Sequence, residues 1–181
     1  MRLVAKPDID RRVTRNADML AKESVLAHPL LCLLRMDAVV PMTRDVIVVP
    51  PGLSLSAAFA VMNRHRIRHL PVAQGGALIG ILSDRDVLAR ATLRADGSLD
   101  VPNVPVATAM TLAPVTCEPS TSVAELARIM TERKIDAVPV LRGSRLVGLV
   151  TSTDLLLLLV GVHEARPLPF DFRVVEEEFA A

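Results

Sequence analysis

Short apolar runs alternate with amphipathic stretches along the middle of the chain. The runs Leu70–Ala73 and Ala77–Leu82 are separated by three residues that include Gly75 and Gly76, a pattern that predicts two strands joined by a tight turn. Ahead of them, apolar residues recur at helical spacing behind Ser54, which predicts a helix with a serine cap. A further helix is expected to begin at Ser83-Asp84, and a β segment, Val46–Val49, comes first. The predicted order is therefore β-α-β-β-α.

The same pattern occurs a second time in the chain. Met42 recurs as Met110 at an offset of 68 residues, and this register holds from residue 42 to residue 88 without a gap. In the second copy, Ser122 and Glu125 have the spacing of a capping box at the start of the first helix. The fold class we predict is α/β (α+β), with tandem β-α-β-β-α repeats packed into one module.

The repeats divide the chain into five segments. We predict a helical N-terminal extension (1–38), a first repeat (39–93), a connector (94–105), a second repeat (106–160) and a short C-terminal tail (161–181). One repeat of about 50 residues buries too little apolar surface to be stable alone, so the two are expected to pack together. The last helix is apolar all round from Leu155 to Val160, which predicts burial on all sides, partly by a second chain in a homodimer.

Two segments carry the repeat most clearly, IRHLPVAQGGALIGILSDRD (67–86) and IDAVPVLRGSRLVGLVTSTD (135–154). Each has a hydrophobic-Pro-Val strand, a glycine turn and a Ser/Thr-x-x-Asp motif. In these features residues 39–160 resemble a pair of CBS (cystathionine-β-synthase) domains, also called a Bateman module. The resemblance implies that an adenosine-containing ligand (AMP, ADP, ATP or S-adenosylmethionine) binds in the cleft between the repeats. It also implies a homodimer that regulates a separate protein.

Composition narrows the remaining classes of function. The 51% hydrophobic and 2% aromatic residues predict an aliphatic core, and the net charge of +1 gives no general attraction to nucleic acid or membrane. Cys32 and Cys117 lack metal-ligand spacing and are interpreted as buried thiols in a reducing compartment. The charged N-terminus has no signal-peptide pattern, and no apolar run is long enough to span a membrane, so we expect a cytoplasmic protein.

The Ser/Thr-x-x-Asp motifs are the first candidate ligand-binding residues. Ser83 and Asp86 in the first repeat, and Thr151 and Asp154 in the second, each follow a strand and open a helix. A hydroxyl at a helix N-terminus can donate to a phosphate oxygen, and a carboxylate can accept from both ribose hydroxyls. The alternative is that each motif is only a helix cap, and the two roles are compatible.

The residues before each Pro-Val pair differ between the repeats. The first repeat carries Arg68 and His69, where some members of the family have basic phosphate-binding residues, whereas the second carries Asp136 and Ala137. We therefore expect unequal sites. The stronger should combine Ser83, Arg85 and Asp86 with Arg68 and His69, and Asp136 and Ala137 should weaken the site of Thr151 and Asp154. The alternatives are a solvated helix end for the arginines and a surface position for His69.

Ile67 and Ile135 occupy equivalent positions and are predicted to pack in the core. The resemblance implies that each also touches an adenine ring. No catalytic triad, phosphate-binding glycine loop or metal-ligand motif is evident, so we expect neither an enzyme nor a covalent cofactor or metal.

Three functions are compatible with these sequence features. The first is a stand-alone sensor of adenosyl nucleotides that controls a partner protein of unknown identity. The second is a dimerisation or scaffold module with degenerate sites. The third is nucleic-acid binding through the basic stretch 64–69, which we consider unlikely because no aromatic residues are interleaved for base stacking.

Overall fold

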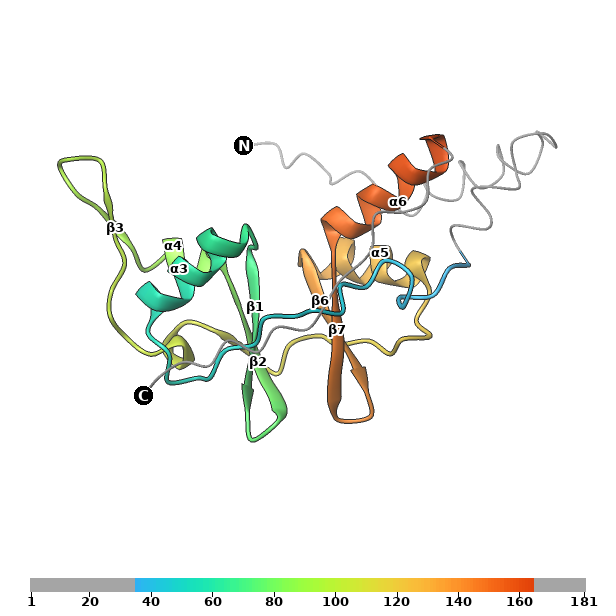
Figure 1. Cartoon of the computed structure of the whole chain (residues 1–181), viewed down its shortest axis with the longest axis horizontal. Helices are drawn as coiled ribbons and strands as arrows, with labels where there is room; N and C mark the ends of the chain where they lie inside the picture. Colours follow the sequence, from blue (N-terminus) through green and yellow to red (C-terminus); the bar gives the residue numbers. More distant parts are fainter. Residues whose placement is uncertain (1–34, 165–181) are drawn as a thin grey trace, which may run out of the picture.

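A computed structural model describes residues 35–164, with side chains to residue 160. The predicted N-terminal helix, Cys32 and the C-terminal tail lie outside the described residues. The α-β-β-α part of the predicted repeat is present twice (Figure 1). The first copy comprises α3 (Leu55–His65), β1 (His69–Gln74), β2 (Ala77–Ser83) and α4 (Asp84–Leu88), and the second comprises α5 (Val123–Arg133), β6 (Ala137–Arg142), β7 (Arg145–Thr151) and α6 (Ser152–Glu164).

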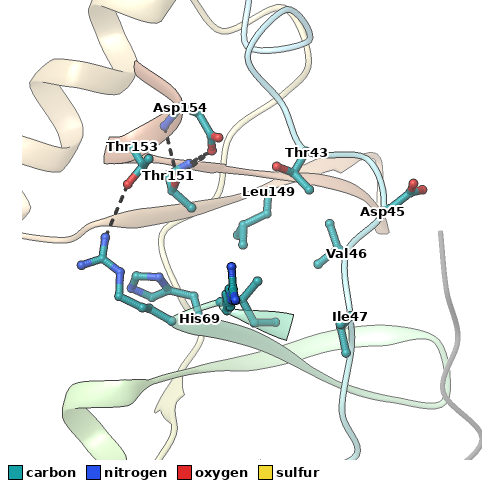
Figure 2. Close-up of a pocket in the computed structure, with 12 residues that line it drawn as sticks. Thr43, Asp45, Val46, Ile47, His69, Leu149, Thr151, Thr153 and Asp154 are labelled. Carbon is teal, nitrogen blue, oxygen red and sulfur yellow. Dashed lines mark hydrogen bonds between the residues drawn. The ribbon is translucent and has the colours of Figure 1, made fainter. Parts of the chain in front are cut away.

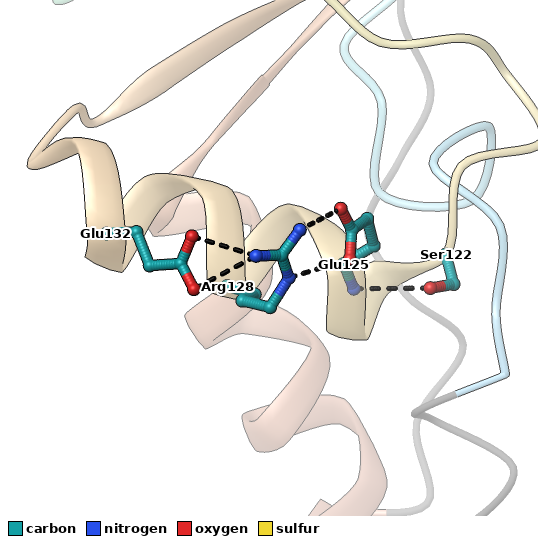
Figure 3. Close-up of polar contacts among 4 residues, drawn as sticks. All are labelled: Ser122, Glu125, Arg128 and Glu132. Atoms are coloured by element: carbon teal, nitrogen blue, oxygen red, sulfur yellow. Dashed lines mark hydrogen bonds and ion pairs between the residues drawn. The ribbon is translucent and has the colours of Figure 1, made fainter. Parts of the chain in front are cut away.

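Helices α3 and α5 begin at the predicted serine caps. The hydroxyls of Ser54 and Ser122 each accept a hydrogen bond of 3.2 Å from the backbone N–H three residues later. The capping box predicted at Ser122 is only half formed, because the Glu125 carboxylate binds Arg128 at 2.5 Å and 2.9 Å instead (Figure 3). Arg128 also bonds Glu132 at 2.8 Å, so an exposed ion-pair row follows this helix.

The first β segment of each repeat is shorter than predicted. Val49 pairs with Val72 in a single parallel bridge, and Cys117 pairs with Val140 in the same way. Pro50 and Pro51 follow Val49, and Pro114 begins the 114–117 segment. These segments form only single bridges because a proline has no N–H with which to extend a ladder of β-sheet hydrogen bonds. The two hairpins, in contrast, have the same register, including one irregularity at the same position in β1 and β6.

The segment that precedes each repeat pairs with the sheet of the other repeat. Strand β5 (Thr111–Leu112) lies against β2, and Thr43 exchanges two backbone hydrogen bonds of 2.9 Å with Leu149 of β7. Gly80 and Gly148 make this approach feasible. A Cβ atom on Gly148 would lie 2.2 Å from Met42 Cγ and Sδ, and one on Gly80 would lie 2.7 Å from Met110 Sδ. We call residues 38–43 and 106–112 the exchanged segments.

The exchange is visible in the two hydrophobic cores. The core around α3, β1 and β2 includes Val106, which precedes the second repeat's helix. The core around α5, β6 and β7 includes Ala38, Met42 and the free cysteine Cys117. Burial raises the pKa of the Cys117 thiol to about 11. The prediction of a buried, unreactive thiol is thus confirmed for Cys117. Each core thus combines one repeat with residues from the exchanged segment of the other.

The predicted connector contains a small hairpin. Strands β3 (Thr92–Leu93) and β4 (Leu99–Asp100) pair around a turn, and the Arg94 guanidinium lies 2.9 Å from the Asp100 carboxylate. The hairpin projects away from the first repeat in Figure 1. A 3-10 turn, η1 (Val106–Thr108), then leads back to the cleft.

Helix α6 is only partly buried within the chain. Leu158 is 1% exposed and packs near Val123, whereas Leu156 and Leu159 are 62% and 52% exposed. The expectation of burial on all sides is therefore not met by this chain alone. No helix in the range 35–164 is long and apolar enough to cross a membrane.

Candidate functional site

Two cavities lie between the repeats and are related by the repeat offset. The first, of about 250 Å³, is lined by residues of both repeats: Thr43, Asp45, Val46, Ile47, Arg66, Ile67, Arg68, His69, Leu149, Thr151, Thr153 and Asp154. The second, of about 360 Å³, is lined by the counterpart of each of these residues at an offset of 68. Three further residues also line the second cavity: Arg68 and His69, which line the first cavity as well, and Asp84, which does not.

Figure 2 shows how the first cavity is enclosed. Thr151 and Asp154 lie on one side, His69 lies opposite them, and Val46 and Ile47 close a third side with apolar surface. An apolar wall beside a few convergent polar groups is the usual composition of a small-molecule site.

Both Ser/Thr-x-x-Asp motifs form complete capping boxes. The Asp154 carboxylate Oδ2 accepts hydrogen bonds from the Thr151 N–H and hydroxyl, both at 2.7 Å, and the Asp154 N–H donates to Thr151 Oγ1 at 3.3 Å. Ser83 and Asp86 make the same contacts at 2.8 Å, 2.7 Å and 3.2 Å. The capping alternative is therefore confirmed. It uses one oxygen of each carboxylate, while Oδ1 accepts no hydrogen bond from the described residues.

Burial changes the chemistry of two groups at the first cavity. Desolvation raises the pKa of Asp154, although the hydrogen bonds from Thr151 partly oppose this. Desolvation also lowers the pKa of His69, with Asp84 opposing and Arg68 adding to the effect. In the ligand-free protein, His69 is therefore biased toward its neutral form, and Asp154 carries an energetically unfavourable buried charge.

Each cavity has one polar contact across its rim, and the two contacts occupy equivalent positions. In the first cavity, Arg68 Nη2 donates to Thr153 Oγ1 over 3.5 Å (Figure 2). In the second, the equivalent residues are Asp136 and Arg85, which form an ion pair of 3.1 Å. The guanidinium of Arg85 is thus already paired, whereas Arg68 is in no ion pair with any described residue.

The structure groups the predicted residues differently from the sequence in one respect. Ile67 lies with Thr151 and Asp154 in the first cavity, and Ile135 lies with Ser83 and Asp86 in the second. The second cavity brings Ser83, Arg85 and Asp86 together with Arg68 and His69, which is the grouping expected from the sequence. Arg68 and His69 also line the first cavity, whereas Asp136 and Ala137 line only the second and so do not replace the basic pair beside Asp154. The reason is that each motif faces the other repeat across the cleft.

The sequence reasoning missed two stretches of the cavity walls. Thr43 and residues 45–47 line the first cavity, and Thr111 and residues 113–115 contribute the equivalent wall of the second. Arg66 and Lys134, which also line one cavity each, end α3 and α5 in the left-handed conformation with φ of 54° and 55°. The repeat offset was the available signal, because it relates each of these residues to its counterpart.

The chain is similar to proteins built from CBS domains. The family model for the CBS domain matches residues 37–92 and 106–161. The CBS domain-containing protein YhcV of Bacillus subtilis is 31% identical over 115 residues, which cover 63% of this chain and 79% of that protein. An inosine-5′-monophosphate dehydrogenase of Korarchaeum cryptofilum also matches, but only over 22% of its length.

Solved structures give the same result. The CBS domain pair of protein MJ0100, in complex with 5′-methylthioadenosine and S-adenosyl-L-methionine, has a TM-score of 0.61 at 26% identity, covering 70% of this chain and 97% of that one. CBSX2 in complex with AMP has a TM-score of 0.62 at 23% identity, covering 72% and 99%, and shows the shared fold. With the family model matched twice, the chain belongs to the CBS domain family, and residues 37–161 form a CBS domain pair.

Proposed function

We propose that this CBS domain pair is a regulatory sensor that binds an adenosine-containing ligand between its repeats and controls a separate protein. The observation that carries the proposal is the first cavity, where an apolar wall, a helix-capping Thr–Asp pair and a basic rim meet. Ile47 and Ile67 supply apolar surface against which we place an adenine ring, and we assign the ribose hydroxyls to Oδ1 of Asp154.

The phosphate is assigned to the first cavity. Arg68 contributes a positive charge that no described carboxylate neutralises, and α6 presents the N-terminus of a 13-residue helix. In the second cavity, Arg85 is paired with Asp136, and α4 has only five residues. This assignment reverses the sequence expectation of a stronger site at Ser83 and Asp86.

Isothermal titration of the full chain with AMP, ATP and S-adenosylmethionine tests the proposal. Asp154→Ala should weaken the dominant AMP site by about one to two decades, because it removes a charged acceptor from the ribose. Asp86→Ala should leave that site largely intact. Glu132→Gln, which removes an exposed carboxylate of α5 outside both cavities, is the control.

Two results would contradict these assignments. If Asp86→Ala abolishes AMP binding and Asp154→Ala does not, the phosphate belongs to the second cavity. If no adenosyl compound binds the unmodified chain at millimolar concentration, the sensor function itself is wrong. In that case the remaining proposal is a dimerisation module, which the exposed leucines of α6 favour.

A further inference from the structure

Besides Asp84, which lines only the second cavity, a pair of basic side chains breaks the symmetry between the two cavities. Arg68 and His69 line both cavities, whereas their repeat counterparts Asp136 and Ala137 line only the second. The physical reason is reach, since an arginine and an imidazole extend past the middle of the cleft and an aspartate and a methyl group do not. The two cavities therefore share a basic wall that comes from the first repeat alone.

From this shared wall we infer that the cavities are coupled through Arg68, so that a phosphate-bearing nucleotide occupies only one of them at a time, whereas an uncharged adenosine in the second cavity is compatible with AMP in the first. The inference rests on the proposed function and adds a rule for joint occupancy. It makes the chain selective for a combination of ligands.

The backbone of Arg68 is held by a hydrogen bond, whereas its side chain can turn toward either cavity. The Arg68 carbonyl accepts a hydrogen bond of 2.9 Å from the Asp84 N–H, which holds the start of β1 against α4. The guanidinium is turned toward the first cavity, where it donates a hydrogen bond of 3.5 Å to Thr153 Oγ1. A phosphate in the first cavity strengthens this orientation through a charge-assisted contact.

The second cavity loses its attraction for phosphate when Arg68 turns away. Arg85 remains paired with Asp136 at 3.1 Å, which leaves Lys134 against the carboxylates of Asp84 and Asp86. A second phosphate would be repelled by these carboxylates. It would also be repelled by the first phosphate on the other side of the shared wall. Adenosine lacks the phosphate and is not subject to this repulsion. By linkage, each phosphate ligand weakens the other by the same factor.

Titration of the full chain with AMP, with and without saturating adenosine, tests the coupling. We expect one AMP per chain, with a second AMP binding roughly tenfold weaker or not at all. Preloading with adenosine should still leave about one AMP site per chain, because adenosine displaced from the first cavity still fits the second. The apparent AMP affinity should fall only by the factor that competition from adenosine for the first cavity requires.

A paired substitution supplies the converse test. Asp136→Arg removes the acid and adds a guanidinium at the position equivalent to Arg68, so AMP stoichiometry should rise from one to two. Glu132→Arg makes the same change of charge on α5, outside both cavities, and should leave one. Circular dichroism checks that both variants fold, and the unmodified chain remains decisive if Asp136→Arg does not.

Two equal, independent AMP sites in the unmodified chain would overturn the coupling while leaving the sensor function intact. Release of all bound adenosine at saturating AMP would also overturn it, because the two ligands would then exclude each other. Absence of binding by both AMP and adenosine would instead refute the proposed function, and the coupling with it.

Discussion

At the residue scale, Asp154 combines a helix cap with a buried charge in the candidate site. Among the described residues it is the one charged side chain that is buried, with 8% of its surface exposed, and desolvation raises its pKa. Its Oδ2 nevertheless caps α6 through Thr151. The carboxylate thus has a favourable contact and an unfavourable environment at the same time.

Two substitutions at Asp154 separate these contributions. Asp154→Asn keeps an oxygen for the Thr151 N–H but removes the buried charge, so at neutral pH the melting temperature should be unchanged or higher. Asp154→Ala also removes the cap, and the free energy of unfolding should fall by about 1 kcal/mol. Both variants should lose AMP affinity. Thermal denaturation without ligand checks the order, and a lower melting temperature for Asp154→Asn than for Asp154→Ala would contradict it.

His69 should make stability depend on pH. Because burial lowers its pKa below the ordinary value of 6.5, the unfolded chain binds more protons than the folded chain between the two pKa values. The contribution of His69 to stability is therefore present above pH 6.5 and declines as pH falls through that window. Denaturant unfolding from pH 7.5 to pH 5 should show the decline, and His69→Gln should reduce it. An identical pH profile for His69→Gln would refute this role.

The residue types of the candidate site were predictable, as was the grouping of residues in the second cavity, but the full composition of the first cavity was not. Thr151, Asp154, Ile67 and Arg68 stood out because the repeat placed each beside a conspicuous local pattern. Their assembly into one cavity depends on packing between repeats, which local patterns do not encode. Asp45 is an example, because it lies in an irregular stretch and yet has a buried Oδ2 without a hydrogen-bond partner among the described residues.

At the scale of elements, the hairpins and helices α3 and α5 followed the sequence closely because their signals are local. Serine caps, glycine turns and apolar periodicity act within a few residues. Pairing of the exchanged segments involves residues far apart in the chain, and that information is absent from periodicity. Helix α6 was predicted to be apolar all round and buried. Its burial also depends on surroundings that the sequence does not specify.

Gly148 tests the exchanged segment directly. A Cβ atom there would lie 2.2 Å from two Met42 atoms and 2.9 Å from the Thr43 carbonyl oxygen, so backbone as well as side chain must move. Gly148→Ala should lower the free energy of unfolding by roughly 1–3 kcal/mol. It should also weaken AMP binding, because Thr43 lines the first cavity.

Gly52 provides the matched control for that substitution. A Cβ atom on Gly52 would have no neighbour within 4 Å, so Gly52→Ala should change stability little. Chemical denaturation of the two variants checks the difference. Equal effects would show that the close approach of Met42 to β7 does not constrain the fold.

At the scale of the whole molecule, we expect a homodimer that covers the exposed face of α6. Leu156 and Leu159 are exposed within the chain, whereas Leu158 packs in its interior. Leu156→Glu should therefore shift sedimentation toward the monomer with little loss of secondary structure. Leu158→Glu should instead destabilise the monomer itself, because it buries a charge.

Concentration dependence distinguishes the two effects. The melting temperature of the unmodified chain should rise with protein concentration, and that of Leu156→Glu should not. A monomeric unmodified chain at tens of micromolar would rule out the dimer at that concentration. The same result would remove the support that α6 gives to a scaffold function.

The exchanged segments have a consequence for the origin of the repeat. Each half of the chain carries the strand that completes the other half, through Thr43 on β7 and β5 on β2. A single-repeat ancestor with this architecture could complete its sheet only by intertwining with a second copy. Gene fusion would then have replaced a concentration-dependent encounter with a covalent tether of high effective concentration. Once tethered, the two halves would have been free to diverge, as the different residues at the equivalent positions Arg68 and Asp136 illustrate.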